Sequence, residues 1–130
     1  LGLLSGLQDR LGMALMLIPH DLGVVASRAS RIVVMYAGRI VEEGPVAAVF
    51  DSPGHPYTRG LLGSQPALGG GRDRLEAIAG VVPRLTELPS GCRFRDRCNV
   101  AIPECSTTDP ALLSFGNGRR AACVLVEENS

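Results

Sequence analysis

Short apolar runs alternate with polar turns in the first half of the chain. The continuous apolar run at residues 13–18 predicts a strand that is buried on both faces of a parallel sheet. Asp21 follows it and is a suitable N-cap for a short helix that reaches about Ala29. A second run rich in Ile and Val, residues 31–36, predicts the next strand. The order strand, crossover helix, strand indicates a parallel βαβ unit over residues 13–36.

Shorter elements are predicted after this unit. The pair Ala37-Gly38 separates the second strand from residues 39–43 (RIVEE), which predicts a hairpin. Two short helices follow, one that begins near Pro45 and one over residues 57–64. One βαβ unit with a hairpin is an incomplete sheet, because both faces of a parallel sheet need cover. Residues 1–64 therefore indicate the end of a larger α/β domain.

The composition changes after residue 64. Residues 65–75 combine glycines, Pro66 and a charge cluster, which is the composition of a linker. Residues 76–130 hold four of the nine prolines and all four cysteines, with little regular periodicity. We therefore expect three parts: an α/β portion, a Gly/Pro-rich linker and an irregular Cys-rich extension.

Composition and charge exclude several classes of function. The 13 basic residues balance the 13 acidic ones, so the chain has no net charge that would attract nucleic acid or an anionic membrane. All 13 basic residues are Arg, and without Lys the sequence contains no complete P-loop and no Schiff-base lysine. The longest apolar run has eight residues, at 11–18, and a membrane-spanning helix needs about 20. We also expect no signal peptide.

His20 is the first candidate for chemistry. It follows the predicted buried strand, and the ligands of open α/β sheets bind at the carboxyl ends of their strands. A neutral imidazole there can hydrogen-bond a phosphate oxygen and orient an attacking water. A structural histidine at a strand–helix junction is the alternative interpretation. For His55, between Gly54 and Pro56, we expect a solvated or turn-packing role.

The cysteines are the second candidate. They are spaced C-x5-C-x6-C-x17-C, at Cys92, Cys98, Cys105 and Cys123. Residues 76–130 have so little apolar periodicity that they need a cross-link to hold them together. Three arrangements remain open: ligation of a metal or iron–sulfur cluster, two disulfides in any of three connectivities, and unlinked structural thiols. We expect the flanking arginines to offset thiolate charge and to lower the thiol pKa values.

Several stretches resemble one known family. Residues 17–25 (LIPHDLGVV) resemble the switch-histidine segment of ABC transporter ATPases, and residues 34–44 (VMYAGRIVEEG) resemble the strand-turn-strand that follows it. Residues 55–62 (HPYTRGLL) resemble the H-P-Y-T-R-x-L-L element of the peptide-importing branch, and the four cysteines resemble the C-terminal extension of that branch. The chain is thus similar, over nearly its whole length, to the C-terminal part of an oligopeptide/dipeptide ABC transporter ATP-binding protein.

The resemblance implies a fold, a site and cofactors. The α/β portion would be the truncated end of a P-loop ATPase domain, and His20 would contact the γ-phosphate of ATP, bound with Mg²⁺ in the parent protein. Walker A, the signature motif and Walker B would all lie before Leu1, so we expect this chain alone to be inactive as an ATPase. Cys92, Cys98, Cys105 and Cys123 would ligate a [4Fe–4S] cluster, with zinc as the fallback. The family's usual Ser or Thr before the histidine is replaced here by Pro19.

The resemblance also implies partners and a location. These partners are transmembrane permease subunits, a second ATPase subunit and, indirectly, a solute-binding protein, at the cytoplasmic face of the membrane as a peripheral subunit. Dipeptides, longer peptides and nickel chelates remain open as cargo. Two alternatives compete with this interpretation: a free-standing iron–sulfur or zinc module without ATPase activity, and a fragment that caps the ATPase dimer. The coding sequence upstream of Leu1 discriminates between them.

Overall fold

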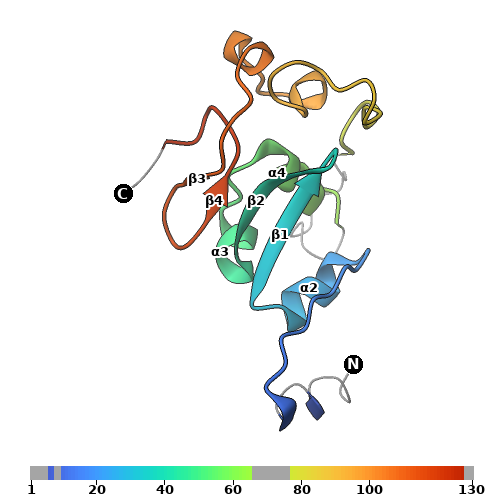
Figure 1. Ribbon diagram of the computed structural model, residues 1–130, viewed down its shortest axis with the longest axis vertical. Helices are drawn as coiled ribbons and strands as arrows, with labels where there is room; N and C mark the ends of the chain where they lie inside the picture. Colours follow the sequence, from blue (N-terminus) through green and yellow to red (C-terminus); the bar gives the residue numbers. More distant parts are fainter. Residues whose placement is uncertain (1–5, 8–9, 66–76, 128–130) are drawn as a thin grey trace.

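The computed structural model of the protein describes residues 6–7, 10–65 and 77–127. A small sheet forms its centre, and the irregular C-terminal segment wraps one end of that sheet (Figure 1). The helices are α2 (Leu22–Arg28), α3 (Val46–Asp51) and α4 (Pro56–Gly63), with 3-10 turns η1 (Arg95–Arg97) and η2 (Pro103–Ser106). The strands are β1 (Arg31–Tyr36), β2 (Arg39–Pro45), β3 (Leu113–Ser114) and β4 (Arg120–Ala121).

Strands β1 and β2 form the predicted antiparallel hairpin, in which Tyr36 pairs with Arg39. The two turn residues, Ala37 and Gly38, have φ angles of 46° and 77°. Two-residue turns with positive φ at both positions match the right-handed twist of the strands that they join. The hairpin is therefore a local consequence of this short stretch of sequence.

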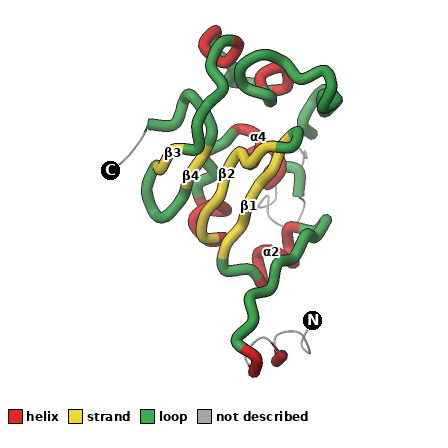
Figure 2. Tube along the Cα trace, viewed as in Figure 1, coloured by secondary structure: helices red, strands yellow, loops and turns green. Residues whose placement is uncertain are grey.

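The far edge of β2 is completed by a strand from the C-terminal segment. Glu43 of β2 pairs with Arg120 of β4, and β3 pairs with β4 in turn, which gives the antiparallel order β1-β2-β4-β3. The Arg120 guanidinium also forms an ion pair of 2.6 Å with the Glu43 carboxylate. Figure 2 shows this four-stranded sheet in yellow, with loops making up most of the C-terminal segment.

The core lies where the hairpin meets the C-terminal segment. Val34, Tyr36 and Val41 are buried from the hairpin, and Phe94 joins them from the Cys-rich region. The Phe94 ring lies edge-on to the Tyr36 ring at 5.1 Å, and Tyr57 of α4 completes the cluster. Apolar contact, and not only a cross-link through cysteine, therefore holds the Cys-rich region against the sheet.

Each helix begins at a residue that the sequence marks as a helix start. The Asp21 carboxylate accepts a hydrogen bond of 2.7 Å from the Gly23 amide and caps α2. Pro45 immediately precedes α3. Pro56 occupies the first turn of α4, where its missing N–H costs nothing. The predicted short helices are confirmed, with bounds that differ by about one residue.

The predicted parallel βαβ unit is wrong for the structure as described. Residues 13–18 form no strand, and their side chains are exposed: Met16 is 87% and Ile18 is 94% accessible. All strand pairs in the described residues are antiparallel. A doubly buried strand needs a neighbouring strand on each side and cover on both faces. The described residues offer no such partners to this run, so it lies beside α2 as an extended segment.

The observed fold is thus a small mixed α/β arrangement with an antiparallel sheet. A P-loop ATPase fold as such is not visible in it. The expected linker, residues 65–75, lies outside the described residues except for Gln65, and the division into residues 1–64 and 76–130 stays a prediction. Over the part of the chain that the structure describes, none of the helices has the length and hydropathy to cross a bilayer.

Candidate functional site

All four cysteines border a single cavity. His55 and Phe94 also line it, together with other residues of the C-terminal segment. Cys105 and Cys123 are buried, Cys92 and Cys98 are half-buried, and none of the four forms a disulfide. The four cysteines therefore lie around one cavity, while the prediction that they ligate a common group stays a prediction. The two-disulfide alternative does not occur in this structure.

A close backbone contact joins the first and third cysteines. The Cys92 amide donates a hydrogen bond of 2.9 Å to the Cys105 carbonyl. Gly91, with φ of 68°, permits this approach, because a Cβ at that position would lie 2.4 Å from the Cys105 carbonyl oxygen. Cys98 directly follows η1 and Cys105 lies within η2, so two tight turns aim these side chains.

The sheet supplies the fourth cysteine. Strand β4 ends at Ala121, and the next amide, that of Ala122, donates a hydrogen bond of 2.9 Å to the Val41 carbonyl of β2. This bond fixes the chain at the position immediately before Cys123. The cysteine that is most distant in sequence therefore reaches the cavity through pairing with the hairpin.

The surroundings of three of the four thiols disfavour their ionised form. Burial is the main cause that raises the pKa of the Cys92, Cys98 and Cys123 thiols above the usual 9.0. Negative charge on neighbouring cysteines raises these pKa values further, which also indicates that the sulfurs lie within electrostatic range of one another. A metal that bound here would have to displace the thiol protons.

The expectation that flanking arginines lower the thiol pKa values is wrong for this structure. Arg93 donates to the Ala37 carbonyl, and Arg95 donates to the carbonyls of Ser90 and Ser106. The others are similarly engaged: Arg97 with Ala79 and Ile78, Arg119 with Ser52 and Gly116, and Arg120 with Glu43. These guanidiniums tie loops together. Among the described arginines, Arg59 of α4 lowers the pKa of the Cys98 thiol, and none is a cause of the pKa shifts of the Cys92 and Cys123 thiols.

The four cysteine side chains have the right chemistry to bind a metal, but the cavity between them is small. Four cysteine sulfurs suit zinc or an iron–sulfur cluster and no hard cation. Yet in the described residues, no group of three or more His, Cys, Asp or Glu side chains is placed to hold a single metal ion. The cavity itself has a volume of about 10 Å³, which is the room of one water molecule. A larger group would require the surrounding loops to move apart.

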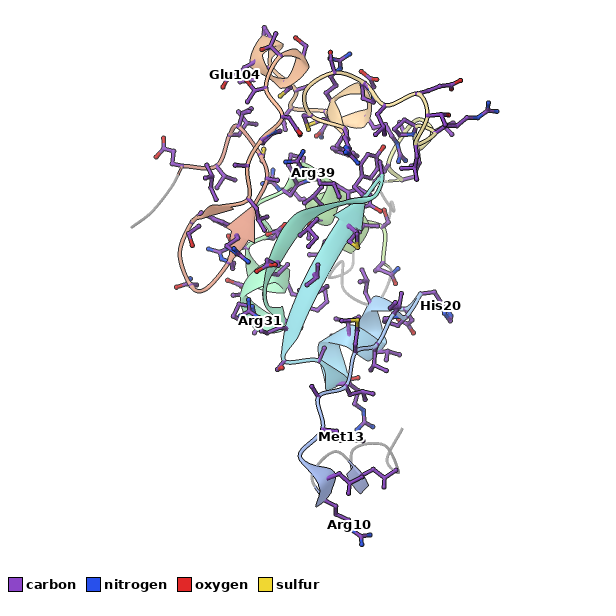
Figure 3. The ribbon with its side chains drawn as sticks, viewed as in Figure 1. Arg10, Met13, His20, Arg31, Arg39 and Glu104 are labelled. Carbon is purple, nitrogen blue, oxygen red and sulfur yellow. The ribbon has the colours of Figure 1, made fainter. Side chains whose placement is uncertain are left out.

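His20 lies far from this cavity. It is exposed and precedes the Asp21 cap of α2. In Figure 3, its side chain points away from the body of the molecule, well separated from Glu104, the neighbour of Cys105. The two candidate sites of the sequence analysis are therefore distinct in space.

Of the two roles expected for His55, the structure shows the turn-packing one: the residue is 1% exposed. It also lines the cysteine cavity, which the sequence analysis did not predict. Its ring nitrogen Nδ1 accepts a hydrogen bond of 3.0 Å from the Tyr57 amide and so caps α4. The buried Glu42 carboxylate accepts hydrogen bonds from the amides of Gly54 and His55, at 2.7 and 3.0 Å. A residue with an acceptor side chain directly before a helix-starting proline was the available signal.

Comparison with known proteins agrees with this layout. Residues 41–105 match the family described as the C-terminal region of oligopeptide/dipeptide transporters. The chain is 46% identical, over 98% of its length, to the oligopeptide transport ATP-binding protein AppD of Bacillus subtilis and covers 39% of that protein. It is also 46% identical over 98% of its length to a Brucella ovis protein whose name places it among peptide import ATP-binding proteins, and covers 40% of it.

The chain thus spans about 40% of the length of the curated relatives it matches. The matched region contains most of strand β2, the H-P-Y element and three of the four cysteines. From this match, the chain belongs to the family of oligopeptide/dipeptide transporter C-terminal regions.

Proposed function

We propose that this chain is the C-terminal part of the ATP-binding subunit of an ABC importer of peptides. The carrying observation is the likeness to AppD over nearly the whole chain. Its partners are then transmembrane permease subunits, a second ATPase subunit and, indirectly, a solute-binding protein, at the cytoplasmic face of the membrane. The ATP-binding names of the relatives favour this function over a free-standing module, and the choice of cargo belongs to the other subunits.

In this proposal, His20 acts on ATP that is bound with Mg²⁺ by motifs elsewhere in the longer protein. The imidazole contacts the γ-phosphate and helps to orient the attacking water. Its exposure at the start of α2 supports this role, because an exposed ring is accessible to a nucleotide held by other residues. Pro19 fixes the backbone before it without providing the hydroxyl that a Ser or Thr would offer.

The test is a His20→Ala substitution in the full-length protein. Orienting water and stabilising transferred charge act in the transition state, so kcat should fall steeply while ATP binding persists. Phosphate release and nucleotide affinity are measured in parallel, with His55→Asn, which lies at the other candidate site, as the control. Turnover by His20→Ala equal to that of the wild type would contradict the role and leave His20 as a structural residue.

We further propose that Cys92, Cys98, Cys105 and Cys123 hold a [4Fe–4S] cluster, with zinc as the second choice. Support comes from the placement of all four free thiols around one cavity. Around a single zinc ion, with Zn–S of about 2.3 Å, tetrahedral sulfurs lie about 3.8 Å apart. The described residues contain no group so placed for one ion, and the cavity of about 10 Å³ means that the loops would have to move before a cluster could bind. A bound cluster would supply a thiolate cross-link between the loops.

Anaerobic purification with iron, sulfide and zinc analysis tests this proposal. We expect about four iron and four sulfide per chain, and loss of both in each of the four Cys→Ser variants. One equivalent of zinc without sulfide would replace the cluster by the second choice. Less than about 0.1 equivalent of every metal, with four freely titratable thiols in the folded protein, would end the metal hypothesis in both forms.

A further inference from the structure

Backbone hydrogen bonds hold much of the wall of the four-cysteine cavity. The Cys92 amide binds the Cys105 carbonyl, and the Ala122 amide, immediately before Cys123, binds the Val41 carbonyl of β2. Residues 109–112, which connect η2 to β3, differ from these parts of the wall. Among the described residues, no backbone hydrogen bond joins this 109–112 connection to another segment.

The side chain of Arg39 ties the 109–112 connection to the sheet. Its Nη1 atom forms an ion pair with the Asp109 carboxylate, and its Nη2 atom donates a hydrogen bond of 3.0 Å to the Pro110 carbonyl. No other hydrogen bond or ion pair reaches the connection from the rest of the described chain. Arg39 is the first residue of β2 and lies at the end of the sheet that the C-terminal segment wraps (Figure 3). One guanidinium therefore makes all the polar contacts that hold this connection.

Pro110 is the part of the connection that closes the cavity. It is buried, whereas Asp109 and Ala111 on either side of it are exposed. It lines both the four-cysteine cavity and a neighbouring cavity that Asp109 also lines, each with a volume of about 10 Å³. An outward movement of Pro110 would therefore remove a wall of both cavities together.

The contact that holds the connection is exposed to solvent. The Asp109 side chain is 54% exposed and the Arg39 side chain is 31% exposed. Ion pairs in such positions are weak and are screened by salt. The strands of the sheet, in contrast, are joined by a ladder of pairs over the whole length of β1. The tie to Arg39 can therefore break while the sheet stays folded.

We propose that the 109–112 connection is a lid on the four-cysteine cavity and that Arg39 is the latch that keeps the lid closed. Opening moves Pro110 out of the wall and gives solvent access to the thiols of Cys105 and Cys123, which are 6% and 8% exposed in the closed form. The lid is a property of the metal-free chain, so the inference does not depend on which group the cavity binds. It names the movement that any group larger than one water molecule needs in order to enter.

Thiol labelling of the metal-free full chain tests the latch. The reduced protein is treated with iodoacetamide for increasing times and then digested with trypsin and a Glu-specific protease. Cleavage after arginine and glutamate puts each cysteine on its own peptide, residues 88–93, 98–104, 105–119 and 121–127. The labelling rates of the buried thiols Cys105 and Cys123 report the opening of the lid, and the half-buried thiols Cys92 and Cys98 are the internal reference.

Two substitutions weaken the latch to different degrees. Arg39→Gln removes both bonds and should raise the labelling rates of Cys105 and Cys123 about three- to tenfold. Asp109→Asn keeps the bond to the Pro110 carbonyl and should raise these rates only about twofold. A change from about 0.1 M to about 1 M NaCl should speed the labelling of the wild type and leave Arg39→Gln unaffected, because only the former has an ion pair to screen.

Asp96→Asn is the matched control. It removes an exposed ion pair of 3.2 Å with Arg95, a residue that lines the same cavity but lies outside the lid. The labelling rates of Cys105 and Cys123 should stay at the wild-type values in this variant. An acceleration equal to that of Arg39→Gln would show that the loss of any nearby ion pair loosens the cavity, and would overturn the role of the latch.

Hydrogen exchange separates the opening of the lid from unfolding of the whole chain. In Arg39→Gln, the amides of β1 and β2 should keep the protection that they have in the wild type while the labelling of the buried thiols accelerates. Loss of that protection by the same factor would show that the thiols are exposed by unfolding, and would overturn the lid. Unchanged labelling in Arg39→Gln would overturn both the lid and the latch.

Discussion

Replacing Gly91 by Ala should damage both the fold and the cysteine site. The new Cβ would lie 2.4 Å from the Cys105 carbonyl oxygen and 2.8 Å from the Ser106 carbonyl carbon, which are backbone atoms with little freedom to move. The left-handed backbone at φ of 68° adds a cost of about 1–2 kcal/mol for a residue with a Cβ. Overpacking of this kind costs a further 1–3 kcal/mol or so. We therefore expect a total loss of about 2–5 kcal/mol in unfolding free energy.

Gly118→Ala is the matched control. Its φ of 67° is almost the same, but its Cβ would meet only the Pro45 side chain, at an ordinary 3.7 Å. It should therefore lose only the backbone cost of about 1–2 kcal/mol. Urea unfolding of the metal-free proteins measures both losses, and iron uptake should fall in Gly91→Ala alone. Equal stability losses and equal iron uptake in the two variants would refute the claim that this close contact builds the site.

Two further predictions concern the polar groups behind the cavity. Glu42→Gln should lower the free energy of unfolding in urea by about 1–3 kcal/mol, because an amide NH₂ would face one of the two buried N–H donors. Glu43→Gln, whose ion pairs reach the surface, should lower it by less than about 1 kcal/mol. Equal losses in the two variants would contradict this prediction. Because burial lowers the pKa of His55 from its usual 6.5 to about 4, its stabilising contribution is complete above pH 6.5 and disappears as pH falls toward 4. The difference of about 2.5 between the two pKa values corresponds to about 3 kcal/mol. Between pH 7 and pH 4, the free energy of unfolding of the metal-free wild type should therefore fall by that much more than that of His55→Asn. Equal decreases in the two proteins would contradict the burial argument.

Local features of this fold are predictable from sequence. The hairpin turn at Ala37-Gly38, the cap at Asp21 and the helix start at Pro56 each depend on a few neighbouring residues. Their preferred conformations are decided by local sterics and by hydrogen bonds within a turn. The short elements between residues 21 and 64 were predictable for this reason, to within about one residue at their ends.

Features that depend on distant contacts were predicted less well. Strand β4 has two residues and pairs with β2 across more than 70 positions, so no hydrophobic periodicity in the sequence predicts it. The apolar pattern of residues 13–18 predicted a buried strand, but burial requires neighbouring strands and covering elements that the described residues do not provide. The cysteine spacing alone left three arrangements open, and the shared site was implied only by the family resemblance. The burial of His55 arises from Phe94 and Glu42, which no local pattern connects to it.

The late arrival of β4 has a consequence for biosynthesis. Arg120 is translated 77 residues after its partner Glu43, an interval of about 4–15 s at 5–20 residues per second. During that time, the second edge of β2 lacks its native neighbour, and an open strand edge can pair with a wrong chain. The buried and ion-paired carboxylates of Glu42 and Glu43 on that strand are unfavourable for such pairing while they remain uncompensated. If the proposed cluster binds, its insertion would be a late step, because Cys123 follows β4 and the fourth ligand is missing until the last strand of the sheet has left the ribosome.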